Sequence, residues 1–185
     1  MKRLEIHVPA YYFDIYSLSW RIKILFYMIT GILRESGSEN RVAMLPGEAA
    51  LLKKLGPEIL VENDAGINAY FSDDEYIRYG VTPALRKEVL SRSDLLLSVN
   101  PLPEEDLDLC HKGQVLCSVV NVAEKREWLE KARNKGLTVL ALDIIPRTTR
   151  AQAMDILSSM ATVSGYKAVL EAASLLPRFF PMFMS

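Results

Sequence analysis

The stretch "QVLCSVVNVAEKREWLEKARNKGLTVLALDII", residues 114–145, decides the fold of this chain. It begins with an apolar run at 114–120 and ends with a second apolar run at 137–145. Both are runs rather than alternations, which is typical of strands that are buried on both faces. Between them, 123–136 has the composition of a surface helix and ends at Gly136, a common helix stop. A strand, helix and strand in this order predict a right-handed crossover between two parallel strands.

The same alternation continues toward the N-terminus. Further strands are expected at 28–35, 58–63 and 94–100, and helices at 46–56, 72–80, 83–92 and 103–110. Ser72 and Glu75 form a capping box at the start of one of these helices. The sequence therefore predicts an α/β fold with an open, doubly wound, mostly parallel sheet, flavodoxin-like or Rossmann-like. A single lobe over 28–176 is expected to contain it.

Composition and charge exclude several kinds of function. The chain has 185 residues and a net charge of about −1, so no strong field attracts nucleic acid. Its two histidines and two cysteines do not cluster, so no metal site is expected. Cys110 and Cys117 are interpreted as reduced structural thiols.

The two ends of the chain differ from the rest. Residues 1–27 contain an aromatic, apolar stretch that charges interrupt, and their role is unknown: a translated upstream extension or a chain-specific element. No apolar run has membrane-spanning length. Residues 177–185, "PRFFPMFMS", are interpreted as the start of a linker to a further lobe.

The polar stretch "PRTTRAQAMDILSSMATVSGY", residues 146–166, carries the candidate site. One long helix is expected from about 151 to 176, which places Gln152 and Asp155 on one polar stripe with Ser159 and Thr162, and Ser158 beside it. Arg147 comes directly after a strand, where ligands bind in open α/β sheets. The pattern alone also allows a plainer interpretation, in which Thr148 or Thr149 caps the helix and Asp155 pairs with an arginine.

Four motifs together resemble the alpha subunit of proton-translocating NAD(P) transhydrogenase, in the alanine dehydrogenase/transhydrogenase N-terminal domain family. They are "ENRVAMLPGEAALLKKLG" (39–56), "ENDAGINAYFSDDEYIRYGV" (62–81), "SDLLLSVNPLPEE" (93–105) and "PRTTRAQAMDILSSMATVSGYKAVLEAA" (146–173). The resemblance extends over about 28–184. It implies the first lobe of an NAD(H)-binding component.

The resemblance assigns roles to four residues. Arg147 would contact the pyrophosphate or nicotinamide side of NAD(H), and Asp155 and Ser158 would hold the nicotinamide ribose and carboxamide. Gln152 would help to gate hydride transfer to NADP(H) on a partner component, so Gln152 and Asp155 are the expected catalytic pair. Alignment of two cofactors, rather than proton chemistry, would be the task of the site.

The resemblance also implies partners. They are a second, NAD-binding lobe of the same subunit, NADP-binding and membrane-spanning components, and a second copy in a homo-dimer. The expected location is cytoplasmic and peripheral to the inner membrane. The Gly-x-Gly-x-x-Gly turn of the family's second lobe does not occur in this sequence, so weak or no NAD(H) binding by the chain alone is expected.

Two alternatives remain. The first is a truncated, non-catalytic lobe that binds no nucleotide. The second is an alanine dehydrogenase N-terminal domain, in which Arg41 would match the substrate-carboxylate arginine. That enzyme family also needs a lysine where this chain has Asn100, and a histidine in 114–120, which has none. A structural role for Arg41, bracing the loop before the first helix, is therefore expected.

Overall fold

The computed structural model describes residues 28–146 and 148–177. Its strands are β1 (Ile29–Ile32), β2 (Glu58–Glu62), β3 (Thr82–Ala84), β4 (Leu95–Leu97), β5 (Val115–Ser118) and β6 (Thr138–Ala141). Its α-helices are α2 (Pro46–Lys53), α3 (Asp73–Arg78), α4 (Arg86–Arg92), α5 (Arg126–Asn134) and α6 (Ile156–Leu175). Four 3-10 turns complete it: η1 (Ile67–Ala69), η2 (Asp106–Asp108), η3 (Leu142–Ile144) and η4 (Gln152–Met154).

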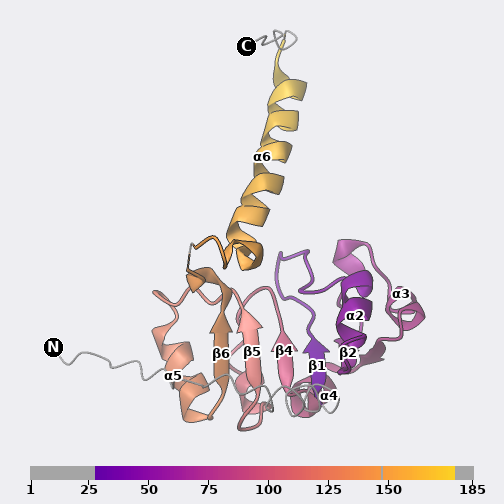
Figure 1. The fold of residues 1–185 in the computed structure, drawn as a ribbon, viewed down its shortest axis with the longest axis vertical. Coiled ribbons are helices and arrows are strands. Elements are labelled where there is room, and N and C mark those ends of the chain that lie inside the picture. Colours follow the sequence, from indigo (N-terminus) through magenta and orange to yellow (C-terminus); the bar gives the residue numbers. More distant parts are fainter. Residues whose placement is uncertain (1–27, 147, 178–185) are drawn as a thin grey trace, which may run out of the picture. The chain divides into compact units, whose positions relative to one another are not determined.

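The strands follow the order β3-β2-β1-β4-β5-β6 (Figure 1). The pairings β1–β2, β1–β4, β2–β3 and β5–β6 are all parallel. This confirms the predicted α/β fold with an open parallel sheet. The chain divides into two compact units, one up to Leu97 and one from Ser98. The single lobe expected over 28–176 and the role of 1–27 stay predictions; 1–27 and 178–185 lie outside the described residues.

In the first unit, α4 packs on β1 and β2, α2 packs on β2, and α3 packs on β3. Ile32, Val61 and Tyr76 are among the residues of its core that are essentially inaccessible to solvent. The Tyr76 hydroxyl donates a hydrogen bond to the Met44 carbonyl at 2.8 Å, so the loop before α2 is fastened to α3. The capping box is present as predicted, since the Glu75 carboxylate accepts the Ser72 backbone N–H at 2.8 Å.

Two predicted helices were wrong in extent. The expected helix at 83–92 begins only at Arg86, because Pro83 and Ala84 belong to β3. Proline is tolerated there since β3 is an edge strand, where a missing N–H leaves no gap in a ladder. The expected helix at 103–110 is reduced to the single 3-10 turn η2.

In the second unit, β5 and β6 pair in register from Val115–Thr138 to Ser118–Ala141. α5 buries Trp128, whose indole N–H donates to the Leu102 carbonyl at 2.7 Å. This bond holds the segment before η2 against α5.

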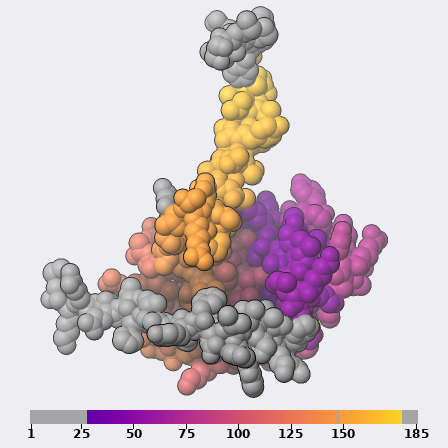
Figure 2. Space-filling model, viewed as in Figure 1, coloured from indigo at the N-terminus to yellow at the C-terminus, as the bar shows by residue number. Residues whose placement is uncertain are grey.

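α6 begins later than predicted and lies open to solvent. The chain forms the turn η4 first, so the helix begins at Ile156 rather than at about 151. No residue of α6 is buried, and Figure 2 shows it as a column of exposed side chains. Although α6 has 20 residues, neither it nor any other described helix has the length and apolar character needed to cross a membrane.

Candidate functional site

A surface hollow follows the carboxyl end of β6 in the second unit. It has a volume of about 320 Å³ and is lined by Thr148, Thr149, Gln152, Asp155 and Ser158. We call it the α6 hollow. The chain reaches it through η3 and Pro146, and a series of turns then carries it to α6. Ala151 is the buried residue of this segment and anchors it.

Asp155 is the N-cap of α6. Its Oδ1 accepts the backbone N–H groups of Leu157 at 3.1 Å and Ser158 at 3.2 Å, which α6 cannot satisfy internally. The sequence pattern also allowed a helix cap formed by Thr148 or Thr149. The helix is capped, but by Asp155, because both threonines precede η4 and lie too early in the chain. Both threonines line the hollow instead.

The hydroxyl groups near the helix start have separate partners. Ser158 Oγ donates to Asp155 Oδ2 at 2.6 Å, so these two side chains are joined at the hollow. Ser159 Oγ and Thr162 Oγ1 donate to the carbonyl groups of the residues four positions before them, at 3.2 and 3.1 Å. The predicted polar stripe was wrong, since Gln152 and Asp155 precede the helix and do not share its periodicity.

The structure brings three of the four predicted site residues together. Gln152, Asp155 and Ser158 all line the α6 hollow, with Gln152 and Ser158 exposed. Arg147 lies outside the described residues. The exposed Arg150 follows in the turns that lead to η4.

One residue near the site was not predicted. Asp143 lies in η3, and its carboxylate accepts the backbone N–H groups of Val120 at 2.9 Å and Val122 at 3.2 Å. Burial raises the pKa of the Asp143 carboxyl, but these hydrogen bonds outweigh burial, so the pKa lies below its ordinary value. The available signal was a lone carboxylate at the end of the apolar run 137–145.

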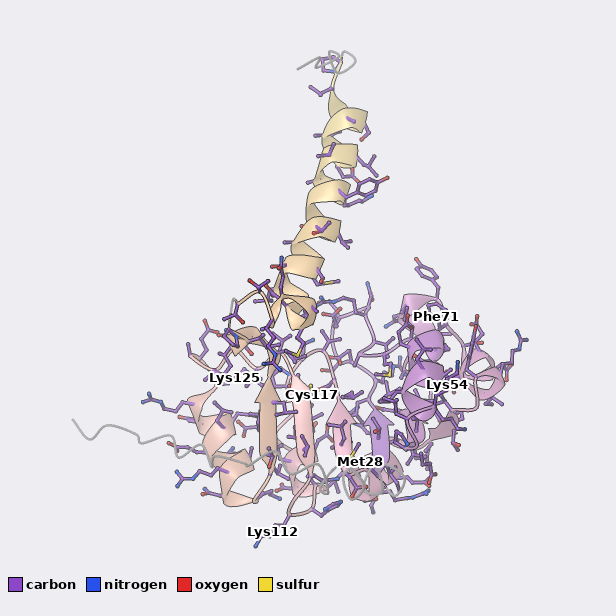
Figure 3. The ribbon with its side chains drawn as sticks, in the orientation of Figure 1. Met28, Lys54, Phe71, Lys112, Cys117 and Lys125 are labelled. Atoms are coloured by element: carbon purple, nitrogen blue, oxygen red, sulfur yellow. The ribbon has the colours of Figure 1, made fainter. Side chains whose placement is uncertain are left out.

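The two cysteines and the possible metal ligands show no features of a reactive site among the described residues. Cys110 and Cys117 are free thiols, and Cys117 lies in β5 (Figure 3). Burial raises the pKa of Cys110 to about 11 and also raises that of Cys117, which disfavours the reactive thiolate. Among the described residues, no group of three or more His, Cys, Asp or Glu side chains is arranged to hold a metal ion.

Arg41 is engaged by a neighbouring carboxylate. Its Nε and Nη2 donate to the two oxygens of Glu39 at 2.8 and 2.6 Å, and its backbone N–H donates to the same side chain at 2.9 Å. These hydrogen bonds, opposed by burial, raise the pKa of Arg41 above its ordinary value. The guanidinium thus braces the loop before α2.

Comparison with known proteins gives a consistent result. The family model described as "Alanine dehydrogenase/PNT, N-terminal domain" matches residues 31–164. The NAD(P) transhydrogenase subunit alpha of Cereibacter sphaeroides is 41% identical over 143 residues, which are 77% of this chain and 27% of that protein. Alanine dehydrogenase of Bacillus subtilis is 29% identical over 153 residues, or 82% of this chain and 39% of that protein.

A solved structure agrees with these sequence relatives. The crystal structure of transhydrogenase from Sinorhizobium meliloti superposes with a TM-score of 0.78 at 33% identity, covering 85% of this chain and 47% of that chain. The chain thus spans less than half the length of each of these three proteins. The family model covers well over half of the 185 residues, and the chain therefore belongs to the alanine dehydrogenase/PNT N-terminal domain family.

Proposed function

We propose that this chain is the N-terminal lobe of a NAD(P) transhydrogenase alpha subunit and that its α6 hollow receives the nicotinamide end of NAD(H). The observation that carries the proposal is the convergence of Gln152, Asp155 and Ser158 on one hollow. The higher identity to a transhydrogenase alpha subunit, 41% against 29% for an alanine dehydrogenase, favours this branch of the family.

The size and chemistry of the α6 hollow fit such a group. Its volume of about 320 Å³ is near the lower end of the range for ligand pockets, roughly 300–1,000 Å³, so it suits one end of a dinucleotide. The Gln152 amide both donates and accepts, which matches a carboxamide. Ser158 donates to Asp155 and keeps oxygen lone pairs that accept a hydrogen bond from an amide N–H.

The chain's own residues would orient rather than react. When bound, NADH would supply the hydride for transfer to NADP⁺ on a partner component. Asp155 and Ser158 would hold the ribose and carboxamide, and the exposed Gln152 would gate the transfer. Arg147, which lies outside the described residues, would contact the pyrophosphate or nicotinamide side. Correct alignment of two reactants is a large part of the barrier reduction that such a site provides.

The proposed function also requires partners. No Gly-x-Gly-x-x-Gly turn occurs in the 185 residues, so the cradle for the pyrophosphate must come from a further lobe of the subunit. NADP-binding and membrane-spanning components complete the proposed enzyme and place it at the inner membrane. Proton translocation is assigned to the membrane-spanning components.

The two alternative functions differ from the proposal in the ligand that the chain must bind. A non-catalytic lobe requires no nucleotide at the α6 hollow. An alanine dehydrogenase requires Arg41 for a substrate carboxylate, but Glu39 already occupies that guanidinium through two hydrogen bonds. The structure of the loop before α2 therefore favours the transhydrogenase proposal.

The test is a titration of the ¹⁵N-labelled chain with nicotinamide mononucleotide, followed by amide chemical shifts. We expect saturable shifts at Gln152, Asp155 and Ser158, with a dissociation constant of about millimolar or weaker. Adenosine monophosphate at equal concentration is the control and should leave these signals in place. Ser158→Ala should weaken binding about fivefold, as expected for loss of one hydrogen bond. The matched variant Ser159→Ala should not, because Ser159 donates to a backbone carbonyl and does not line the hollow.

Three outcomes would contradict the proposal or part of it. Absence of any shift at the hollow would support the non-catalytic lobe. Shifts caused by pyruvate around Arg41 would support the alanine dehydrogenase alternative. Micromolar binding of NADH to the chain alone would show that no further lobe is needed.

A further inference from the structure

The loop that follows β5 is held by the side chain of Asp143, which lies just after the end of β6. The backbone ladder between β5 and β6 stops at the pair Ser118–Ala141. Val120 is completely buried, and a buried N–H without a partner is costly. The Asp143 carboxylate supplies that partner at 2.9 Å, so it takes over where the ladder ends.

The geometry of the loop directs two donors at this carboxylate. Asn121 has a φ of 56°, the left-handed conformation, and separates Val120 from Val122. The N–H groups on either side of it both reach Asp143, one at each carboxylate oxygen. Such convergent backbone N–H groups form a natural anion-binding concavity, which the chain here fills with its own carboxylate.

Asp143 is linked to the α6 hollow through the element in which it lies. Its element, η3, is followed within a few residues by Thr148, and α6 lies close to η3 in the structure. One short turn thus contacts the loop after β5 and the helix that Asp155 caps.

We propose that Asp143 is a positioning residue of the α6 hollow, whose carboxylate ties the loop after β5 to η3 and thereby fixes where the lining of the hollow stands relative to β5 and β6. The effect on nicotinamide affinity rests on the proposed function. The effect on the geometry of the hollow does not rest on the proposed function, so either effect can be disproved without the other.

The experiment compares the chain with Asp143→Asn and Asp143→Glu. Asparagine keeps one acceptor and turns an amide N–H toward the other donor, whereas glutamate keeps the carboxylate. In Asp143→Asn we expect the amide signals of Val120 and Val122 to move together with those of Gln152 and Ser158. Nicotinamide mononucleotide should bind about tenfold more weakly.

Asp143→Glu should restore affinity to within about threefold of the unchanged chain. Asp108→Asn is the control, because this acid of the same unit pairs with Lys135 away from the hollow. It should alter neither the hollow signals nor the affinity.

The proposal is overturned if the changes stay within 119–122 and 142–145 while the hollow signals and the affinity remain those of the unchanged chain. If Asp143→Asn does not fold, Asp143→Glu decides. Displaced loop amides with an undisturbed hollow would then refute the positioning role. If nicotinamide mononucleotide does not bind the unchanged chain, the proposed function fails, and the coupling of the loop and hollow signals still tests the role of Asp143.

Discussion

At the scale of single residues, Asp155 combines two tasks. Its carboxylate begins α6 by accepting two backbone N–H groups, and it also lines the α6 hollow beside Ser158. The cap fixes the orientation of the carboxylate, since the N–H groups that it accepts belong to a rigid helical turn. A capping role and a binding role are therefore compatible here, although the sequence pattern presented them as alternatives.

Removal of this cap should loosen the start of α6. Asp155→Ala is expected to cost about 1 kcal/mol of helix stability, so the amides of Leu157 and Ser158 should exchange with solvent about fivefold faster. Asp155→Ser, which restores a capping oxygen, should keep exchange slow. Hydrogen exchange measured by NMR checks this, and equal exchange rates in the alanine variant and the unchanged chain would contradict it.

Tyr76 gives a prediction at high pH. Burial, with smaller contributions from the carboxylates of Asp73 and Glu48, raises the pKa of Tyr76 to about 12. Because the folded pKa exceeds the unfolded value of about 10, the contribution of Tyr76 to stability is fully present below pH ~10 and is lost as pH rises through about 12. The free energy of unfolding should fall less steeply over this window in Tyr76→Phe than in the unchanged chain. Parallel slopes in urea denaturation would show the prediction to be wrong.

At the scale of elements, Gly31 in β1 is closely packed by its neighbours, whereas Gly165 in α6 is not. A Cβ added to Gly31 would lie 2.4 Å from Ser93 Oγ and 2.6 Å from Val89 Cγ1, so β1 passes too close to α4 for any side chain. Gly165 has nothing within 4 Å of the same position. No described residue therefore packs closely against α6 at Gly165.

Alanine substitutions should separate these two cases. Gly31→Ala should destabilise the fold by about 1–3 kcal/mol through overpacking. Gly165→Ala should instead raise the helix content of α6, because alanine is favoured by about 1 kcal/mol in a helix interior. Thermal unfolding followed by circular dichroism measures both changes. A stable Gly31→Ala variant would contradict the close approach of β1 and α4.

At the scale of the whole molecule, α6 is the unusual part. Leu157, Val163 and Val169 are 44%, 60% and 61% exposed, and their six-residue spacing turns them toward three different sides of the helix. A helix that is apolar on several sides normally lies inside a larger structure. The chain also spans less than half the length of the transhydrogenase relatives that it matches.

Self-association of the chain is the expected consequence. Light scattering should give an average mass that rises with concentration, because exposed apolar surface favours association. Val163→Glu combined with Val169→Glu should shift the chain toward the monomer, whereas Lys112→Glu, far along the sequence on a turn, should not. A monomeric mass for the unchanged chain over the full concentration range would count against the prediction.

The sequence by itself determined the elements whose signals are local. The apolar runs gave β1, β2, β4, β5 and β6, and Ser72 with Glu75 gave the start of α3. The alternation of strands and helices gave the parallel sheet, since a crossover helix leaves parallel pairing as the favoured arrangement. The candidate residues Gln152, Asp155 and Ser158 were also found from the sequence, through their motif and its resemblance.

Only the tertiary structure decided the features that depend on distant partners. Pro83 belongs to a strand because β3 pairs with the edge of β2. Asp143 holds the loop after β5 because Val120, more than twenty residues earlier, has a buried N–H that donates to it. α6 begins only after its N-cap Asp155, later than expected, because η4 and the buried Ala151 fix the chain before the helix begins. Periodicity describes one segment at a time, whereas these contacts depend on which segments the fold brings together.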